Sequence, residues 1–262
     1  MSRPLTPGEL IMLVDRKKRR YLTRLKDGGE FHSHAGALPH DDVIGQEEGQ
    51  EFRSGKGAAY LVVRPTMADF VLKMKRGAQV IYPKDLGPIL VNADIFPGAK
   101  VFESGLGSGA LSMTLLRAGA HITGYEIRDD FAEQAQQNVV DFLGNEALVN
   151  YDVHVRSSYE PLEHSGFDRM VLDLPEPWNV VPHAVDALET GGVILAYTPS
   201  IIQATKFKAA LTDNGFGMAE TLEVLNRGWH VEPAQNAVRP DHRMVAHTGF
   251  LTTARKLATP PT

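Results

Sequence analysis

The fold of this chain is decided by one stretch, Val101-Phe102-Glu103-Ser104-Gly105-Leu106-Gly107-Ser108-Gly109-Ala110. Its first residues are apolar, three glycines then alternate with other residues, and a run favourable to a helix follows. Glycine at these positions lets the backbone turn tightly and approach a ligand where any Cβ would clash. The pattern predicts a strand, a ligand-binding turn and a helix in succession.

Two classes of cofactor fit this loop. Gly105, Gly107 and Ala110 satisfy the dinucleotide fingerprint G-x-G-x-x-A. Glu126 follows about 20 residues downstream, where an acid binds a ribose. With Glu103 in front, the glycines also fit the E-x-G-x-G-x-G loop of S-adenosylmethionine-dependent methyltransferases. Glu103 favours the second class, because its charge would repel a pyrophosphate but attract an ammonium and a sulfonium. A glycine turn without a ligand is the remaining alternative.

The sequence after Lys100 alternates between short apolar runs and longer helical stretches, which is typical of a parallel α/β sheet. The clearest helices are predicted at 129–143 and 204–211, where apolar residues recur at helical spacing. The strands are predicted at 101–102, 121–125, 151–155, 169–172, 193–197, 221–225 and 246–253.

The first 65 or so residues have a different texture, with glycines between short apolar runs, which predicts a small β-rich module. A helix over 66–75, with Thr66 and Asp69 as cap residues, follows it. We therefore expect an N-terminal β domain over 1–68, a catalytic domain over 69–257 and a flexible tail over 258–262.

Composition narrows the class of protein. The chain has 262 residues, a net charge of −5, 43% apolar residues and 23% charged residues, which is a globular composition without a uniformly basic surface. The sequence contains no cysteine, so disulfides, thiolate nucleophiles and cysteine zinc sites are excluded. No apolar run approaches the roughly 18 residues of a membrane span, and residues 1–10 lack a signal-peptide pattern. We expect a cytoplasmic protein.

A second polar block, Asp173-Leu174-Pro175-Glu176-Pro177-Trp178, follows the strand predicted at 169–172. Open α/β sheets present their chemistry at the carboxyl ends of strands. In nucleotide-modifying methyltransferases, an acid or amide followed by proline and an aromatic residue binds the amine and the face of a base at this point. A surface loop with an incidental acid is the alternative interpretation.

With these motifs, the chain resembles the tRNA (adenine-58-N1)-methyltransferases of bacteria and archaea over nearly its whole length. More specific than the glycine loop are four further segments: Tyr60 to Pro65, Tyr82-Pro83-Lys84-Asp85, Arg227-Gly228-Trp229, and Arg239 to Leu251. The resemblance implies a small N-terminal β domain and a class I, Rossmann-like, mostly parallel seven-stranded sheet. It also implies a homotetramer that transfers a methyl group from S-adenosylmethionine to N1 of adenosine 58 in the T loop of tRNA, leaving S-adenosylhomocysteine, without a metal.

The resemblance also implies roles for individual residues. Asp173 would contact the target adenine near the transferred methyl group, with Tyr82 lining the same pocket. Pro175, Trp178, His247 and Thr248 would shape the remaining wall. The cofactor would be bound by Glu103, Gly105, Leu106, Gly107, Ser108, Gly109, Glu126, Ser158 and Asp173.

One departure concerns the cofactor adenine. Family members often carry an acid after the third strand, whereas this chain reads Ser157-Ser158. A serine hydroxyl is a neutral acceptor and should bind an amine more weakly, by about 1 kcal/mol.

Other features allow two interpretations each. The stretch from Arg16 to Arg20 could bind RNA or form a solvated hairpin. His32, His34 and His40 lack further metal ligands and favour polar loop chemistry over a metal site. Lys84 and Asp85 could form an acid/base pair, but they are predicted to cap a helix that begins near Asp85.

Two other functions remain open. A nicotinamide oxidoreductase is disfavoured by Glu103 and by the absence of a Tyr-x-x-x-Lys pair. A non-catalytic RNA-binding subunit is disfavoured because both the glycine loop and Asp173 are present.

Overall fold

The computed structural model describes residues 3–77 and 79–259. The chain forms two compact units, Met1–Lys75 and Arg76–Thr262. Helix α1 (Met67–Lys73) belongs to the first unit, so the division falls a few residues after the one expected at 68. Residues 260–262 of the expected tail lie outside the described residues. Throughout the described part of the chain, each helix is too short or too polar to cross a bilayer.

The first unit is built from short antiparallel strands, as the glycine spacing predicts. Four strands form a sheet in the order β2-β1-β6-β5, and β3 and β4 form a separate hairpin. Leu13, Leu25, Tyr60 and Val62 are among the buried residues of its core. The bounds are β1 (Leu10–Asp15), β2 (Arg20–Arg24), β3 (Glu30–Ser33), β4 (Gly36–Pro39), β5 (Gln50–Arg53) and β6 (Ala59–Val63), with a short 3-10 helix η1 (His40–Asp42).

Helix α1 begins with the predicted cap. The Thr66 hydroxyl accepts a hydrogen bond from the Asp69 amide at 3.2 Å, and the Asp69 carboxylate accepts one from the Thr66 amide at 3.1 Å. This reciprocal capping box satisfies two amides that a helix end leaves unpaired. Arg20 of β2 also pairs with Asp69 at 2.5 Å and ties the helix to the sheet.

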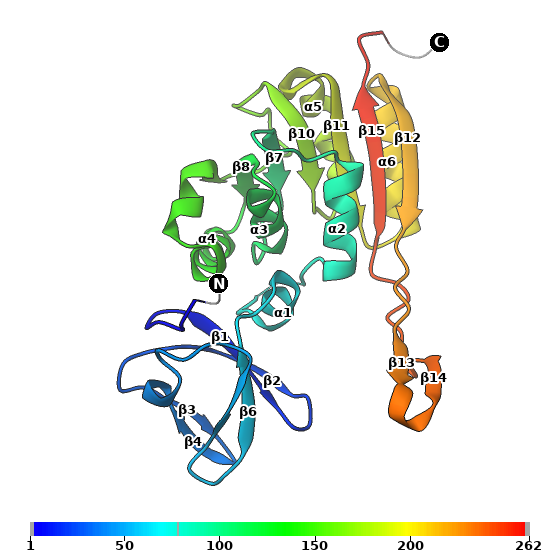
Figure 1. The fold of residues 1–262 in the computed structure, drawn as a ribbon. Helices are drawn as coiled ribbons and strands as arrows, with labels where there is room; N and C mark the ends of the chain where they lie inside the picture. Colours follow the sequence, from blue (N-terminus) through cyan, green and yellow to red (C-terminus); the bar gives the residue numbers. More distant parts are fainter. Residues whose placement is uncertain (1–2, 78, 260–262) are drawn as a thin grey trace. The chain divides into compact units, whose positions relative to one another are not determined.

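The second unit has a seven-stranded sheet in the order β12-β15-β11-β10-β7-β8-β9 (Figure 1). β7 to β11 are parallel, and β15 runs antiparallel between β11 and β12. This confirms the predicted mostly parallel seven-stranded sheet. The strands are β7 (Lys100–Ser104), β8 (His121–Glu126), β9 (Tyr151–Val155), β10 (Phe167–Leu172), β11 (Leu188–Thr198), β12 (Phe216–Glu223) and β15 (Phe250–Lys256), and β13 (Trp229–Glu232) and β14 (Ala237–Pro240) form a hairpin.

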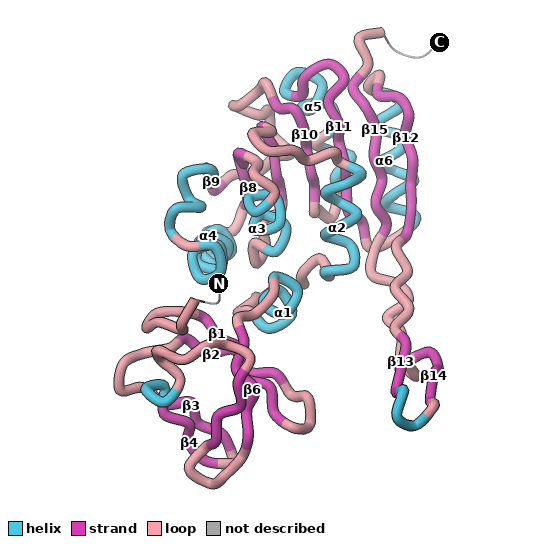
Figure 2. Tube along the Cα trace, viewed as in Figure 1, coloured by secondary structure: helices cyan, strands magenta, loops and turns pink. Residues whose placement is uncertain are grey.

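Helices cover both faces of this sheet, since their cyan coils lie in front of and behind the magenta strands (Figure 2). One face carries α5 and α6, whose Ala184, Phe207 and Leu211 pack with Phe102 and Tyr125 of the strands. The helices are α2 (Pro83–Asn92), α3 (Ala110–Arg117), α4 (Asp129–Leu143), α5 (Val181–Ala187) and α6 (Ile201–Asp213), with 3-10 helices η2 (Asn145–Asn150), η3 (Pro177–Asn179) and η4 (Pro233–Gln235).

The predicted helix at 129–143 is confirmed residue for residue, but the bounds of the last two strands are shifted: β12 begins at Phe216 rather than 221, and β15 begins at Phe250 rather than 246. β12 and β15 pair from Phe216 opposite Lys256 to Glu223 opposite Phe250. The pairing of β11 with β15 ends where Thr198 lies opposite Phe250. Residues 246–249, which precede Phe250, therefore have no strand partner among the described residues. Apolar composition predicts a strand there, but a strand also needs a hydrogen-bonding neighbour.

Candidate active site

The strand order defines where a ligand should bind. From β7 the chain proceeds outward through β8 to β9, and then returns to start the other half of the sheet at β10, beside β7. Ligands of open α/β sheets bind where the order reverses, beyond the carboxyl ends of the strands. Here that point lies between Ser104, which ends β7, and Asp173, which follows β10 and donates its amide to the Ser104 carbonyl at 2.9 Å.

The glycine loop occupies this switch point. Gly105 has φ of +86°, and a Cβ on it would lie 2.0 Å from the Asp173 carbonyl oxygen. Gly109 has φ of +77°, and a Cβ on it would lie 2.9 Å from the Ala135 carbonyl oxygen in α4. Both positions therefore require glycine, for conformation and for space. The close packing puts the loop backbone directly beside Asp173.

Glu126 ends β8 and fixes the loop from the other side. Its carboxylate accepts hydrogen bonds from the Gly107 amide at 3.1 Å and from the Arg128 amide at 3.1 Å. The side chain is 8% exposed. A carboxylate held by backbone donors at a strand end can offer its remaining lone pairs to hydroxyl donors, as binding of a ribose requires.

Glu103 lies beneath the loop and is fully buried. One of its oxygens accepts a hydrogen bond from Ser112 Oγ at 2.9 Å, and Oε2 has no partner among the described residues. Burial raises its pKa to about 8, and the charges of Asp173 and Glu126 add to this rise. A buried carboxyl without a cation is held neutral near pH 7, and a nearby cationic ligand would favour its ionised form.

Asp173 joins the loop to a cavity of about 440 Å³. Removal from water, together with the charge of Glu126, raises the pKa of Asp173 to about 7. A carboxyl in such a cavity can accept a hydrogen bond from an amine. Any positive charge formed beside it favours the ionised form of the carboxyl. The cavity is lined by Gln79, Val80, Ile81, Tyr82, Asp173, Tyr197, Pro199, Val245, His247 and Thr248.

Asp85 does not cap helix α2, contrary to the sequence prediction. Tyr82 is the N-cap residue and makes no side-chain cap, while the Asp85 side chain is fully buried. Its carboxylate accepts from Thr248 Oγ1 at 2.7 Å and pairs with Lys84 Nζ at 2.8 Å. Lys84 also donates to the Val224 carbonyl at 2.6 Å. The reason is tertiary: the first turn of α2 faces the loop before β15, whose donors attract the carboxylate inward.

His247 and Tyr197 form the rest of the polar wall. The His247 imidazole bonds Glu223 at 2.6 Å and the Pro199 carbonyl at 2.8 Å, and these bonds raise its pKa. Burial raises the pKa of Tyr197 to about 12, so its phenol stays protonated and can donate a hydrogen bond. Sequence reasoning missed Tyr197, although its place at the end of β11 could have indicated it.

The remaining predicted residues are placed as follows. Ser158 is buried and accepts from Ser104 Oγ at 2.8 Å, directly behind the loop. Leu106 and Ser108 are buried within the loop itself. Pro175 and Trp178 are not among the residues that line the cavity. Trp178 packs under Lys206 of α6, whose Nζ lies 4.9 Å from the ring centre.

Comparison with known proteins gives one consistent family. Residues 57–238 match the family described as "tRNA methyltransferase complex GCD14 subunit", and residues 4–50 match "TrmI-like N-terminal". A relative from Thermus thermophilus, named tRNA (adenine(58)-N(1))-methyltransferase TrmI, is 37% identical, with 95% of this chain and 97% of the relative covered.

Two solved structures cover the whole fold. A tRNA (m1A58) methyltransferase TrmI from Aquifex aeolicus is 28% identical, covers 98% of this chain and 100% of its own, and has a TM-score of 0.84. A Thermotoga maritima protein described as a SAM-dependent O-methyltransferase is 28% identical, covers 98% and 96%, and has a TM-score of 0.91. The chain therefore belongs to the tRNA methyltransferase family of the GCD14 subunit and the TrmI enzymes.

Proposed function

We propose that this chain transfers a methyl group from S-adenosylmethionine to N1 of adenosine 58 in the T loop of tRNA. The observation that carries the proposal is Asp173, which touches the glycine loop through its backbone and is one of the residues that line the 440 Å³ cavity. Relatives named for this reaction share the family over nearly the whole chain. One residue thereby faces both the cofactor side and the substrate side.

The residues around the loop fit S-adenosylmethionine. The missing Cβ atoms at Gly105 and Gly109 let the loop pack directly against the backbones of Asp173 and Ala135, which holds the loop at the switch point of the sheet. Glu126 would hold the ribose hydroxyls, and a cationic ligand would favour the ionised form of Glu103, whose buried Oε2 has no partner among the described residues. When bound, the cofactor supplies an electrophilic methyl group. Ser158 accepts a hydrogen bond from Ser104 Oγ, and its hydroxyl stays a candidate partner for the cofactor adenine.

The residues that line the cavity would orient the target adenine rather than activate it as a nucleophile. Adenine N1 has a free lone pair and needs no strong base, so the main task is alignment with the methyl group. Asp173 would accept a hydrogen bond from the adenine 6-amine, with Tyr82 against the base. Methylation places positive charge on the base, and the Asp173 carboxylate stabilises that charge more in the transition state than in the ground state.

Asp173→Ala tests this assignment. The variant should bind S-adenosylmethionine with nearly unchanged affinity and should lose most of kcat, because the interaction that it removes strengthens as positive charge develops on the base. Tritium transfer to unmodified tRNA measures kcat, and calorimetry measures cofactor affinity. Comparable turnover in the variant would remove Asp173 from the mechanism.

The same transfer assay separates the alternative functions. Nucleoside analysis of the labelled tRNA should give 1-methyladenosine from position 58. Label on an oxygen would favour the chemistry in the description of the Thermotoga maritima protein. No transfer, with tRNA binding intact, would favour an RNA-binding subunit, and cofactor-dependent reduction of a nicotinamide would favour an oxidoreductase.

We further infer a homotetramer that acts in the cytoplasm without a metal in the transfer step. The β13–β14 hairpin supports self-association, because Trp229, Val231 and Val238 are each more than half exposed on it. Light scattering of the purified chain tests the tetramer. A monomer at micromolar concentration would contradict it.

A further inference from the structure

Three metal-ligating side chains meet outside the proposed active site, at the β9 edge of the sheet. Asp152 and His154 are two residues apart on β9, so their side chains point to the same face. His164 comes from the loop between β9 and β10. One ligand atom from each residue lies within 4.8 Å of the others. Asp152 is exposed and both histidines are half-buried, so an ion could reach the cluster from solvent.

The distances are close to those that a metal ion requires. His154 Nε2 lies 2.8 Å from the Asp152 carboxylate, and the imidazoles of His154 and His164 have ring centres 4.6 Å apart. Ligand atoms around a tetrahedral zinc ion are about 3.3 Å apart, which follows from bonds of about 2.0 Å. Without a metal ion, His154 Nε2–H can donate a hydrogen bond to the Asp152 carboxylate over this distance, and a metal ion would take the place of that proton.

Tyr125 orients His164 for this role. The Tyr125 side chain is fully buried, and its hydroxyl lies 2.8 Å from His164 Nδ1. With Nδ1 engaged, Nε2 is the nitrogen left to bind an ion. Metal-binding histidines almost always have such a hydrogen-bond partner on the other ring nitrogen.

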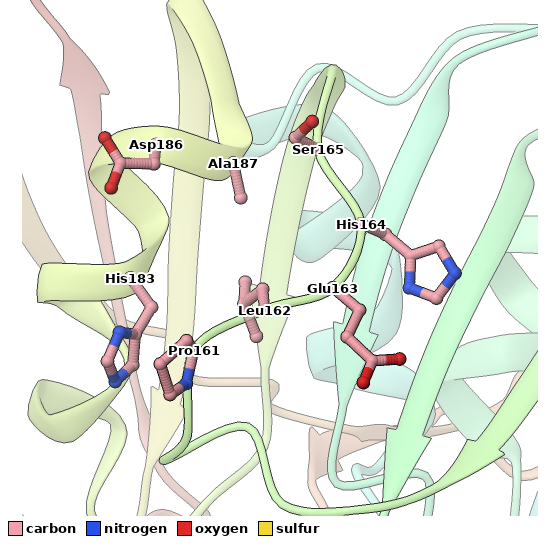
Figure 3. Close-up of a pocket in the computed structure, with 8 residues that line it drawn as sticks. All are labelled: Pro161, Leu162, Glu163, His164, Ser165, His183, Asp186 and Ala187. Carbon is pink, nitrogen blue, oxygen red and sulfur yellow. The ribbon is translucent and has the colours of Figure 1, made fainter.

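The surrounding charge is mixed. Glu163 precedes His164, and its pKa is lowered by Arg156, to which it is paired, and further by the nearby imidazoles of His164 and His154. Figure 3 shows Glu163 and His164 directed to one side of the loop from Pro161 to Ser165, with His183 of α5 on the other side. The negative charge of Glu163 therefore partly offsets the positive charge of Arg156 near the imidazoles of His154 and His164.

We propose that Asp152, His154 and His164 bind a divalent first-row transition metal ion, with zinc as the physiological candidate. Two imidazoles and one carboxylate suit zinc, cobalt or nickel, whereas calcium and magnesium prefer oxygen ligands. Water would complete the coordination. The ion would join strand β9 to the following loop, and the inference is independent of the proposed methyl transfer.

Titration of the full-length, metal-free protein with Co²⁺ tests the site. The visible absorption of Co²⁺ bound to nitrogen and oxygen ligands should saturate at one ion per chain, and Zn²⁺ should displace it. The chain has no cysteine, so thiolate cannot contribute to the spectrum. Absence of saturable binding, or saturation at a different stoichiometry, overturns the proposal.

Variants locate the ion. His154→Gln with His164→Gln should abolish the Co²⁺ spectrum, while circular dichroism shows that the chain still folds. The matched control, His32→Gln in β3 with His34→Gln in the turn that follows, should retain the wild-type affinity. Tyr125→Phe should weaken binding by about 10- to 100-fold, as expected when an orienting hydrogen bond is removed. Binding that survives the first pair, or is abolished in the control, refutes the assignment.

Discussion

Replacing Glu103 by glutamine should stabilise the free protein increasingly as the pH rises. Burial raises the pKa of Glu103 from its ordinary value of 4.5 to about 8. A carboxyl whose pKa is higher in the folded state contributes stability that is fully present below pH 4.5 and is lost as the pH rises through 8. Glutamine does not titrate, so Glu103→Gln removes this loss.

The magnitude follows from the size of the pKa shift. At 1.36 kcal/mol per pH unit, the wild type should lose about 4 kcal/mol relative to Glu103→Gln between pH 5 and pH 8. For a domain of this size, that corresponds to a difference of about 10 °C in Tm. The amide group replaces Oε2, which has no partner among the described residues, and any cost of that change is the same at every pH.

Calorimetric melting at pH 5, 6, 7 and 8, without cofactor, measures the effect. Glu160→Gln, at an exposed glutamate, controls for the loss of one negative charge. Parallel pH profiles for wild type and Glu103→Gln would refute the reasoning, because they would mean that Glu103 is ionised in the folded protein throughout this range.

The same substitution should weaken the binding of the cofactor. A cationic ligand beside Glu103 favours its ionised form, so wild-type affinity should rise between pH 6 and pH 8 as protons are released on binding. Glu103→Gln should bind S-adenosylmethionine about 10- to 100-fold more weakly at pH 8, since one charged partner is removed. Calorimetric titration in buffers of different ionisation enthalpy counts the protons, and a proton count unchanged by the substitution would contradict this linkage.

Three further predictions concern other parts of the chain. Gly105→Ala places a Cβ 2.0 Å from the Asp173 carbonyl oxygen, so the loop must shift. We expect kcat/KM to fall at least about 100-fold, as it does when a reacting centre is displaced by about 1 Å. Wild-type kinetics would show that the loop tolerates a side chain. Thr248→Val removes the 2.7 Å hydrogen bond to buried Asp85 and should lower the free energy of unfolding by about 2 kcal/mol in urea titrations, whereas no change would mean that Lys84 alone satisfies the carboxylate. Residues 16–18 are exposed between β1 and β2, and reversing their charge should weaken the dependence of tRNA affinity on salt. The slope of log affinity against log salt should fall by about 0.7 to 0.9 for each phosphate that these residues neutralise in the wild type. An unchanged slope would mean that these residues form a solvated turn that does not bind RNA.

The sequence alone determined the architecture because the signals for it are local. The glycine loop, the alternation of strands and helices, and the apolar period of 129–143 each act over a few residues, and the structure confirms them. The Thr66 cap is equally local, since it joins residues three positions apart. The positions of Glu103, Glu126 and Asp173 at strand ends follow from the same pattern, because parallel strands bring their carboxyl ends to one edge.

Tertiary structure alone decided the environment of each group. Asp85 was predicted as a cap but is buried against Thr248, which lies 163 residues further along the chain. The pKa of Glu103 depends on exclusion of water, which no local pattern encodes. Asp152, His154 and His164 form a cluster because the loop after β9 folds back onto the edge strand. Local patterns fix elements, whereas burial and side-chain encounters arise from contacts between segments that are distant in the chain.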